Sequence, residues 1–108
     1  MFKVIAGLTL CGGLAATAAA QNAEVARGEK LFADQKCALC HSIGDKGNKK
    51  GPLDGVASKL KNEQVREWIV DAKGMAAKTK AARKPEMKAY TLPKEDVEAL
   101  AAYLMTLK

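Results

Sequence analysis

Two cysteines three positions apart, followed directly by a histidine, form the chemically most informative stretch of the sequence. The stretch reads Cys37-Ala38-Leu39-Cys40-His41. This spacing is typical of covalent haem attachment, because each thiol can add to one haem vinyl group when the run is coiled as a turn of helix. The histidine is then held under the iron, where an imidazole nitrogen can coordinate it. The spacing therefore predicts one covalently bound haem c, attached through Cys37 and Cys40, with His41 as an iron ligand.

Two other kinds of site use the same pair of cysteines, a structural zinc site and a dithiol redox pair. A closed zinc site needs four Cys or His ligands. The sequence has one histidine and three cysteines, and the third, Cys11, lies in a segment that we expect to be removed. Zinc would then need a carboxylate or a second copy of the chain. A thioredoxin-like pair needs a βαβ context, and the sequence has no convincing strand pattern, so haem is favoured over both.

The N-terminal segment has the features of a secretory signal peptide. Lys3 supplies a positive charge, residues 4–14 are apolar or small, and Ala18-Ala19-Ala20 is a small-residue cleavage pattern. We therefore expect a signal peptide at residues 1–20, a mature domain at residues 21–108, and a periplasmic or otherwise exported protein. An uncleaved anchor is the alternative, but the apolar run is shorter than the about 20 residues that usually span a bilayer. No stable membrane insertion is expected after cleavage.

The expected mature chain of 88 residues is one small domain with a limited core. It keeps 17 Lys and Arg against 12 acidic residues, a net formal charge of +5. Six of the basic residues gather in one stretch: Lys73, Lys78, Lys80, Arg83, Lys84 and Lys88. Nucleic acid is disfavoured as a partner, because the chain is expected to be exported and the stretch has no interleaved aromatic residues. We expect the partner of this basic stretch to be a redox protein with an acidic docking face. The alternative is that the stretch is a solvated loop that binds no partner.

Helical periodicity predicts the first and last elements of the mature chain. The first helix is expected after Asn22, a good N-cap, with one apolar face that leads to the haem motif. That face carries Val25, Gly28, Leu31 and Phe32. The last helix is expected to begin near Pro93, a residue suited to a first helical turn. Its apolar stripe is Val97, Leu100, Ala101, Leu104 and Leu107.

Between these two helices we expect a further helix and two loops. Residues 62–72 have helical periodicity, whereas residues 44–52 are rich in glycine and lysine. Residues 73–89 have no clear apolar face and contain glycine and proline, so we expect a long lysine-rich loop there. The residues of the middle helix expected to face inward are Val65, Trp68, Ile69 and Ala72. The pattern as a whole predicts an all-α domain of three or more helices around one haem.

The second axial position of the iron cannot be filled by another histidine of the same chain, because His41 is the only one. The remaining candidates are a methionine, another side chain such as lysine, water, or no ligand. Met75, Met87 and Met105 remain after the expected cleavage. Met105 extends the apolar stripe of the last helix and is expected to fill the core, so Met75 and Met87 are the candidates for the iron.

Three blocks of the sequence resemble those of class I c-type cytochromes, which are small exported all-α proteins with one haem. The blocks are Gly28-Glu29-Lys30-Leu31-Phe32 ahead of the haem motif, Gly51-Pro52-Leu53-Asp54-Gly55-Val56, and Met87-Lys88-Ala89-Tyr90 leading into Leu100-Ala101-Ala102-Tyr103-Leu104. The resemblance covers residues 23–108. It implies the cytochrome c fold and the function of a one-electron carrier rather than an enzyme.

The resemblance also implies roles for single residues. His41 would be the proximal and Met87 the distal iron ligand. The carbonyl of Pro52 would accept a hydrogen bond from the proximal imidazole and so orient it. Gly28 would allow the first and last helices to approach closely.

Two aromatic residues have two interpretations each, and the distal segment departs from the family pattern. Trp68 would either pack at the haem edge and donate to a propionate or simply fill the core. Tyr90 would either contact haem or pack within its loop. Lys88 stands where the family often has proline after the distal methionine, and residues 71–74 lack the proline that often follows the Trp helix.

Two further functions compete with the free electron carrier. A haem protein with an open or displaceable sixth position could act as a sensor or enzyme for a small gas or peroxide. No second histidine or acid–base pair near the motif supports peroxidase chemistry. The third possibility is a cytochrome subunit that stays docked on a dehydrogenase or oxidase.

Overall fold

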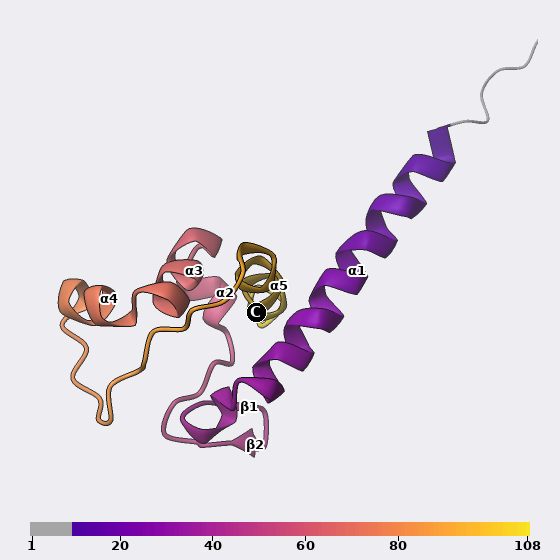
Figure 1. The fold of residues 1–108 in the computed structure, drawn as a ribbon. Helices are drawn as coiled ribbons and strands as arrows, with labels where there is room; N and C mark the ends of the chain where they lie inside the picture. The colour runs from indigo at the N-terminus through magenta and orange to yellow at the C-terminus, as the bar shows by residue number, and fades with distance from the viewer. Residues whose placement is uncertain (1–9) are drawn as a thin grey trace, which may run out of the picture.

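The computed structural model describes the backbone of residues 10–108 and the side chains from residue 18 onward. Lys3 and the first nine residues of the expected signal peptide lie outside this range. Within it the chain forms helices α1 (Leu10–Asp34), α2 (Val56–Lys59), α3 (Asn62–Val70), α4 (Ala72–Thr79) and α5 (Lys94–Leu104). A short 3-10 turn, η1 (Cys37–Leu39), and a hairpin of β1 (Ser42–Ile43) and β2 (Lys46–Gly47) follow α1. The expected all-α cytochrome-like architecture is confirmed (Figure 1).

Helix α1 is longer than the sequence analysis predicts. The expected start after Asn22 is wrong, because the helix runs without interruption from Leu10 to Asp34. Alanine, the strongest helix former, dominates the residues just before Asn22, so the helix continues through this position and does not use it as a cap. Nowhere in residues 10–108 does a helix combine the length and the apolar character needed to cross a membrane.

The predicted close approach of the first and last helices is confirmed at Gly28. A Cβ atom at this position would collide with the backbone carbonyl of Ala99 and lie 2.7 Å from Cβ of Tyr103 on α5. Glycine inside a helix costs about 1 kcal/mol relative to alanine. The close crossing of the two helices explains why glycine stands here despite that cost, because any side chain at Gly28 would hold α1 and α5 apart. Figure 1 shows α5 lying against the C-terminal part of α1.

The core forms where the apolar faces of α1, α3 and α5 meet. The predicted inward faces are confirmed, since this cluster contains Phe32, Val65, Ile69, Val97, Leu100, Ala101 and Leu104. The rings of Phe32 and Tyr103 pack edge to face, with centroids 6.0 Å apart and an interplanar angle of 66°. Such a pair adds about 0.5–1.5 kcal/mol beyond the burial of its area. This ring pair joins α1 to α5, and the buried Val65 and Ile69 hold α3 against both helices.

The segment expected to be one long lysine-rich loop begins with a helix. Asp71 lies between α3 and α4, and its carboxylate accepts a hydrogen bond from the backbone N–H of Gly74 at 3.2 Å, which caps α4. Ala72 and Met75 are buried and provide the apolar contacts of α4. Because lysines surround them in the sequence, these two residues alone do not form a recognisable apolar pattern. The prediction of a loop is therefore wrong for residues 73–79. It is confirmed for residues 80–89, which belong to the irregular connection of residues 80–93 between α4 and α5.

The small antiparallel sheet is a feature that the sequence analysis did not predict. Each strand has two residues, paired as Ser42 with Gly47 and Ile43 with Lys46. Strands of this length cannot show a period-two pattern, so the sequence carried no signal for them. The hairpin follows the cysteine motif directly, and a parallel bridge joins Ser42 to Pro52.

Candidate functional site

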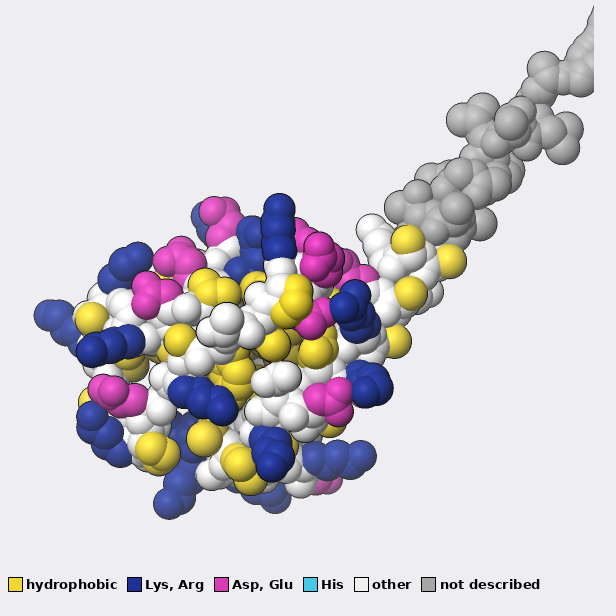
Figure 2. All heavy atoms as spheres, in the orientation of Figure 1, with side chains coloured by type: hydrophobic (Ala, Val, Ile, Leu, Met, Phe, Trp, Pro, Cys, Tyr) yellow, Lys and Arg dark blue, Asp and Glu magenta, His cyan; other side chains and the backbone are white. Residues whose placement is uncertain are grey.

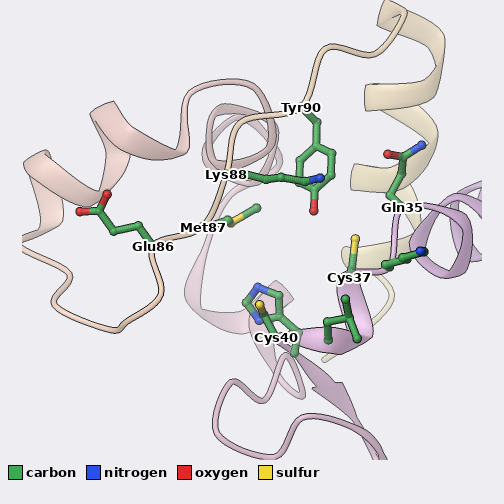
Figure 3. Close-up of a pocket in the computed structure, with 10 residues that line it drawn as sticks. Gln35, Cys37, Cys40, Glu86, Met87, Lys88 and Tyr90 are labelled. Atoms are coloured by element: carbon green, nitrogen blue, oxygen red, sulfur yellow. The ribbon is translucent and has the colours of Figure 1, made fainter.

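The cysteine motif lies in the turn that follows α1. The chain reverses through Lys36, which has a left-handed backbone with φ 59°, and then forms η1. The N–H groups of Cys40 and His41 donate to the carbonyl of Cys37 at 3.1 and 3.0 Å. Neither Cys37 nor Cys40 forms a disulfide, and both are half-buried. Figure 3 shows their sulfur atoms directed toward the space below the segment that carries Met87 and Tyr90.

A cavity of about 490 Å³ lies between this turn and the segment that leads to α5. Most of its wall is apolar and comes from residues of α1, α3 and α5 and of the loop before α2: Phe32, Leu53, Val65, Trp68, Ile69 and Leu100. The cavity volume falls within the roughly 300–1,000 Å³ usual for sites that bind cofactors. A smaller neighbouring hollow of about 300 Å³ shares Cys37, Cys40, His41, Met87 and Tyr90 with it.

The imidazole of His41 is held in one tautomer by the backbone. Its Nδ1 lies 3.0 Å from the carbonyl oxygen of Gly51. A carbonyl can only accept, so Nδ1 carries the proton and Nε2 keeps a lone pair for a metal. Burial lowers the pKa of His41, and the charge of Arg83 lowers it further, whereas the bond to Gly51 opposes the shift. A neutral imidazole is the form that coordinates iron, so these contacts prepare His41 for that role.

The carbonyl that orients His41 is that of Gly51 and not that of Pro52. The expectation for Pro52 is therefore wrong by one residue. The parallel bridge to Ser42 explains the difference: Ser42 N–H donates to Gly51 O at 3.0 Å, and Leu53 N–H donates to Ser42 O at 2.8 Å. This register turns the Gly51 carbonyl toward residues 41–42. Pro52 itself is exposed, and its ring fixes the φ angle of the backbone directly after the Gly51 carbonyl.

The structure brings Met87, and not Met75, to the cavity of His41. Met87 is half-buried and lines both the cavity and the neighbouring hollow. Met75 is buried in α4 with 5% of its surface exposed and is absent from the lining of both. Met105 packs against the α1–α3–α5 core, as its position in the apolar stripe predicts.

Tyr90 and Trp68 line the same cavity from two sides. The backbone N–H of Tyr90 donates to the carbonyl of Ile69 on α3 at 2.9 Å, which fixes the segment that enters α5. Burial raises the pKa of Tyr90, and the neighbouring Cys37 and Cys40 raise it further. The ammonium of Lys88 lies 5.0 Å from the centre of the Tyr90 ring. Trp68 lines the cavity from α3 and is half-buried, an arrangement that suits either of its two interpretations.

These residues fit a covalently held haem better than a bare metal ion. Two thiols, an oriented imidazole and a thioether line one mostly apolar space, which matches the donors and the apolar surface of haem c. Among the residues that the structure describes, no group of three or more Cys, His, Asp or Glu side chains could hold a metal ion. A zinc site built from those residues is thus not supported.

The sequence matches the cytochrome c family model over residues 25–108. The chain belongs to the cytochrome c family. This cytochrome is also 31% identical over 91 residues to "Cytochrome c oxidase subunit 2" of Alkalihalophilus pseudofirmus, an alignment that covers 76% of this chain and 25% of the relative. It therefore spans about a quarter of the length of that relative. No solved structure matches it.

Membership of the cytochrome c family implies a covalently bound haem c and a role in carrying electrons. Two functional residues of this cytochrome were missed by sequence reasoning. Gly51 lies in one of the three blocks that resemble the family, but the resemblance assigns the role of carbonyl acceptor to the adjoining Pro52. Arg83 lines the cavity although it is exposed, and a run of basic residues does not reveal which of its members does so.

Proposed function

We propose that this protein is an exported monohaem cytochrome that carries single electrons, with its haem iron between His41 and Met87. The proposal rests on one observation: a single cavity is lined by Cys37, Cys40, His41 and Met87. The haem, once bound, supplies an iron that cycles between the ferrous and ferric states. We assign no enzymatic activity to the chain, because a methionine at the sixth position leaves no place for a substrate on the iron.

Each of these residues has a separate task in this proposal. Cys37 and Cys40 anchor the haem by thioether bonds. His41 presents Nε2 to the iron, because its Nδ1 donates to Gly51. Met87 offers a neutral sulfur, which favours the reduced state and raises the potential. The apolar wall excludes water from the iron, so that little rearrangement accompanies the change of charge.

An acidic redox protein is the proposed partner, docking where the cavity opens to solvent. Lys36, Lys88 and Leu39 line the smaller hollow, and the side chain of Leu39 is 70% exposed. Charges are unevenly divided over the face that Figure 2 shows: its lower edge carries mainly Lys and Arg side chains, whereas its upper part carries acidic and basic side chains together. Such an uneven distribution of charge steers an encounter more than it strengthens the complex. The basic stretch around Met87 supplies Lys73, Lys78, Lys80, Lys84 and Lys88, all exposed.

The first test is to establish how the haem is held. The exported holoprotein should keep its haem colour after denaturation, and its mass should exceed that of the polypeptide by one haem. Extraction of the haem by acid acetone would contradict attachment through Cys37 and Cys40. A variant with both cysteines replaced by alanine should release the haem, whereas Leu39→Ala, between them and exposed, should retain it.

Export and cleavage are tested on the same material. N-terminal sequencing should begin at Gln21, as the Ala18-Ala19-Ala20 pattern predicts. A mature form that keeps Lys3 would overturn the cleavage site and would favour a membrane anchor. A mature form that carries lipid on Cys11 would overturn the freely diffusing carrier.

A docked subunit is the second candidate, and the named relative favours it. That relative is a cytochrome c oxidase subunit, and this chain aligns with one quarter of it. A cytochrome that stays on a larger complex would use the same haem chemistry. Purification from its source at low and at high salt distinguishes the free carrier from the docked subunit. A free carrier purifies alone at both salt concentrations, whereas a subunit purifies together with its complex at low salt.

A further inference from the structure

We propose that Arg83 is a positioning residue that ties the Met87 segment (residues 82–89) to the haem-attachment turn (residues 37–41). We further propose that its charge favours ferrous iron. The inference rests on the proposed function, since it concerns how the distal ligand is held. It goes beyond the ligand set, because Arg83 itself would not bind the iron. Arg83 lies four positions before Met87 in the connection between α4 and α5.

The contact that carries the inference crosses the cavity mouth. Nη1 of Arg83 donates to the backbone carbonyl of Cys40 at 2.6 Å, between residues 43 positions apart. Cys40 directly precedes His41, so the guanidinium of the distal segment meets the backbone of the proximal turn. A hydrogen bond from a charged donor is shorter and stronger than one between neutral groups.

Gly51 provides the space that this contact needs. A Cβ atom at Gly51 would collide with Nη1 of Arg83 and with the Cys40 carbonyl, and it would lie 3.0 Å from Cζ of Arg83. The carbonyl of the same glycine accepts the Nδ1 hydrogen bond of His41. Arg83 therefore packs against the two backbone groups that place the proximal ligand, and the fit depends on the missing side chain.

The Met87 segment has few other ties to the rest of the molecule. The last backbone hydrogen bond before it is from Ala81 to Ala76, and the next is from Tyr90 to Ile69. Across residues 82–89, all of them described, no backbone hydrogen bond joins the segment to another element. The ion pair between Lys84 and Glu86 is internal to the segment. Within residues 82–89, the hydrogen bond of Arg83 is thus the one that reaches the proximal turn.

The charge of Arg83 acts on the site in a second way. The guanidinium is held against the backbone carbonyl of Cys40, the residue directly before His41, and it lines the same cavity as the imidazole of His41. A positive charge held this close disfavours further positive charge at the site, because like charges repel. Ferric iron on the same imidazole carries one more positive charge than ferrous iron. The same field should therefore disfavour the ferric state, and removal of the charge should lower the reduction potential.

The test compares Arg83→Gln and Arg83→Lys in the holoprotein with Lys84→Gln, which removes a charge one residue away. Three quantities are measured: the reduction potential, the rate at which imidazole binds to the ferric protein, and the weak far-red band of methionine on ferric iron. Arg83→Gln should lower the potential and speed imidazole binding severalfold. Arg83→Lys should restore most of the potential but not the slow binding, because a lysine lacks the planar fork and reach of the guanidinium. Lys84→Gln should leave the binding rate unchanged.

Two results would overturn the inference. If Arg83→Gln and Lys84→Gln behave alike in potential and binding rate, the contact with Cys40 has no role in holding Met87. If Arg83→Lys fails to restore the potential, the charge argument is wrong. Absence of the far-red band from the unmodified protein is a different result, because it contradicts methionine ligation and with it the proposed function.

Discussion

The carbonyl oxygen of Gly51 lies 3.0 Å from Nδ1 of His41, and this single contact decides which imidazole nitrogen is free. The donor must be Nδ1, so Nε2 faces the cavity as an unprotonated base. The same carbonyl accepts from the N–H of Ser42 at 3.0 Å. The parallel bridge between Ser42 and Pro52 and the orientation of the ligand are therefore set by the same carbonyl.

The first prediction concerns the crossing of α1 and α5. Gly28→Ala should destabilise the protein, although alanine is the better helix former by about 1 kcal/mol. The added Cβ meets the Ala99 carbonyl, and forcing atoms into a packed contact typically costs about 1–3 kcal/mol. Thermal and urea unfolding measure the change. Ala23→Val, on an exposed position of the same helix, should change stability far less, and equal losses in the two variants would contradict the crossing argument.

The second prediction separates the three methionines by two readouts. Met87→Ala should remove the far-red band and open the ferric protein to cyanide or imidazole, with a small loss of stability because Met87 is only half-buried. Met75→Ala should keep the band but cost about 2–5 kcal/mol of stability, as for other large-to-small core changes. Met105→Ala should also keep the band. Loss of the band in Met75→Ala with its persistence in Met87→Ala would reverse the ligand assignment.

The sequence predicts those helices whose apolar pattern repeats along several residues. The apolar faces of α1, α3 and α5 were predictable because helical periodicity records burial over two or more turns. The position of α4 was not, because its stability depends on one cap and two buried side chains among lysines. Residue types also limited the candidate iron ligands to a few side chains, since few side chains bind haem iron, and two of those candidates, His41 and Met87, line one cavity. Gly51 and Arg83 were not predictable, because their roles depend on backbone register and on one side chain that crosses the cavity mouth.

The third prediction uses Tyr103 to test the pH dependence of stability. Burial raises the pKa of Tyr103 above its ordinary value of 10.0, and the charge of Glu29 adds to the shift. The folded state therefore holds the phenolic proton more tightly than the unfolded state does. Its contribution is fully present below pH 10.0 and is lost as the pH rises through the higher folded pKa. The free energy of unfolding should fall in that alkaline range.

A matched substitution isolates this contribution from the titration of the lysines. Tyr103→Phe keeps the ring that packs on Phe32 but has no proton to lose. Its stability should fall less steeply above pH 10.0 than that of the unmodified protein, while the two curves run parallel at neutral pH. Identical slopes in the alkaline range would mean that other groups account for the whole loss.

The last prediction concerns the basic face around Met87. The rate of electron transfer with an acidic redox protein should fall as ionic strength rises, because salt screens steering over a Debye length of roughly 8 Å at physiological strength. Replacing Lys84 and Lys88 by Glu should lower the rate further and flatten its salt dependence, without moving the haem spectrum. The control replaces Lys94 and Lys108 by Glu, which makes the same change in net charge at residues that neither line the cavity nor lie in the segment around Met87. If the face around Met87 steers the encounter, the first pair slows transfer much more than the second. Equal effects would show that only net charge matters, and a rate indifferent to salt and to both pairs would leave these lysines as a solvated loop.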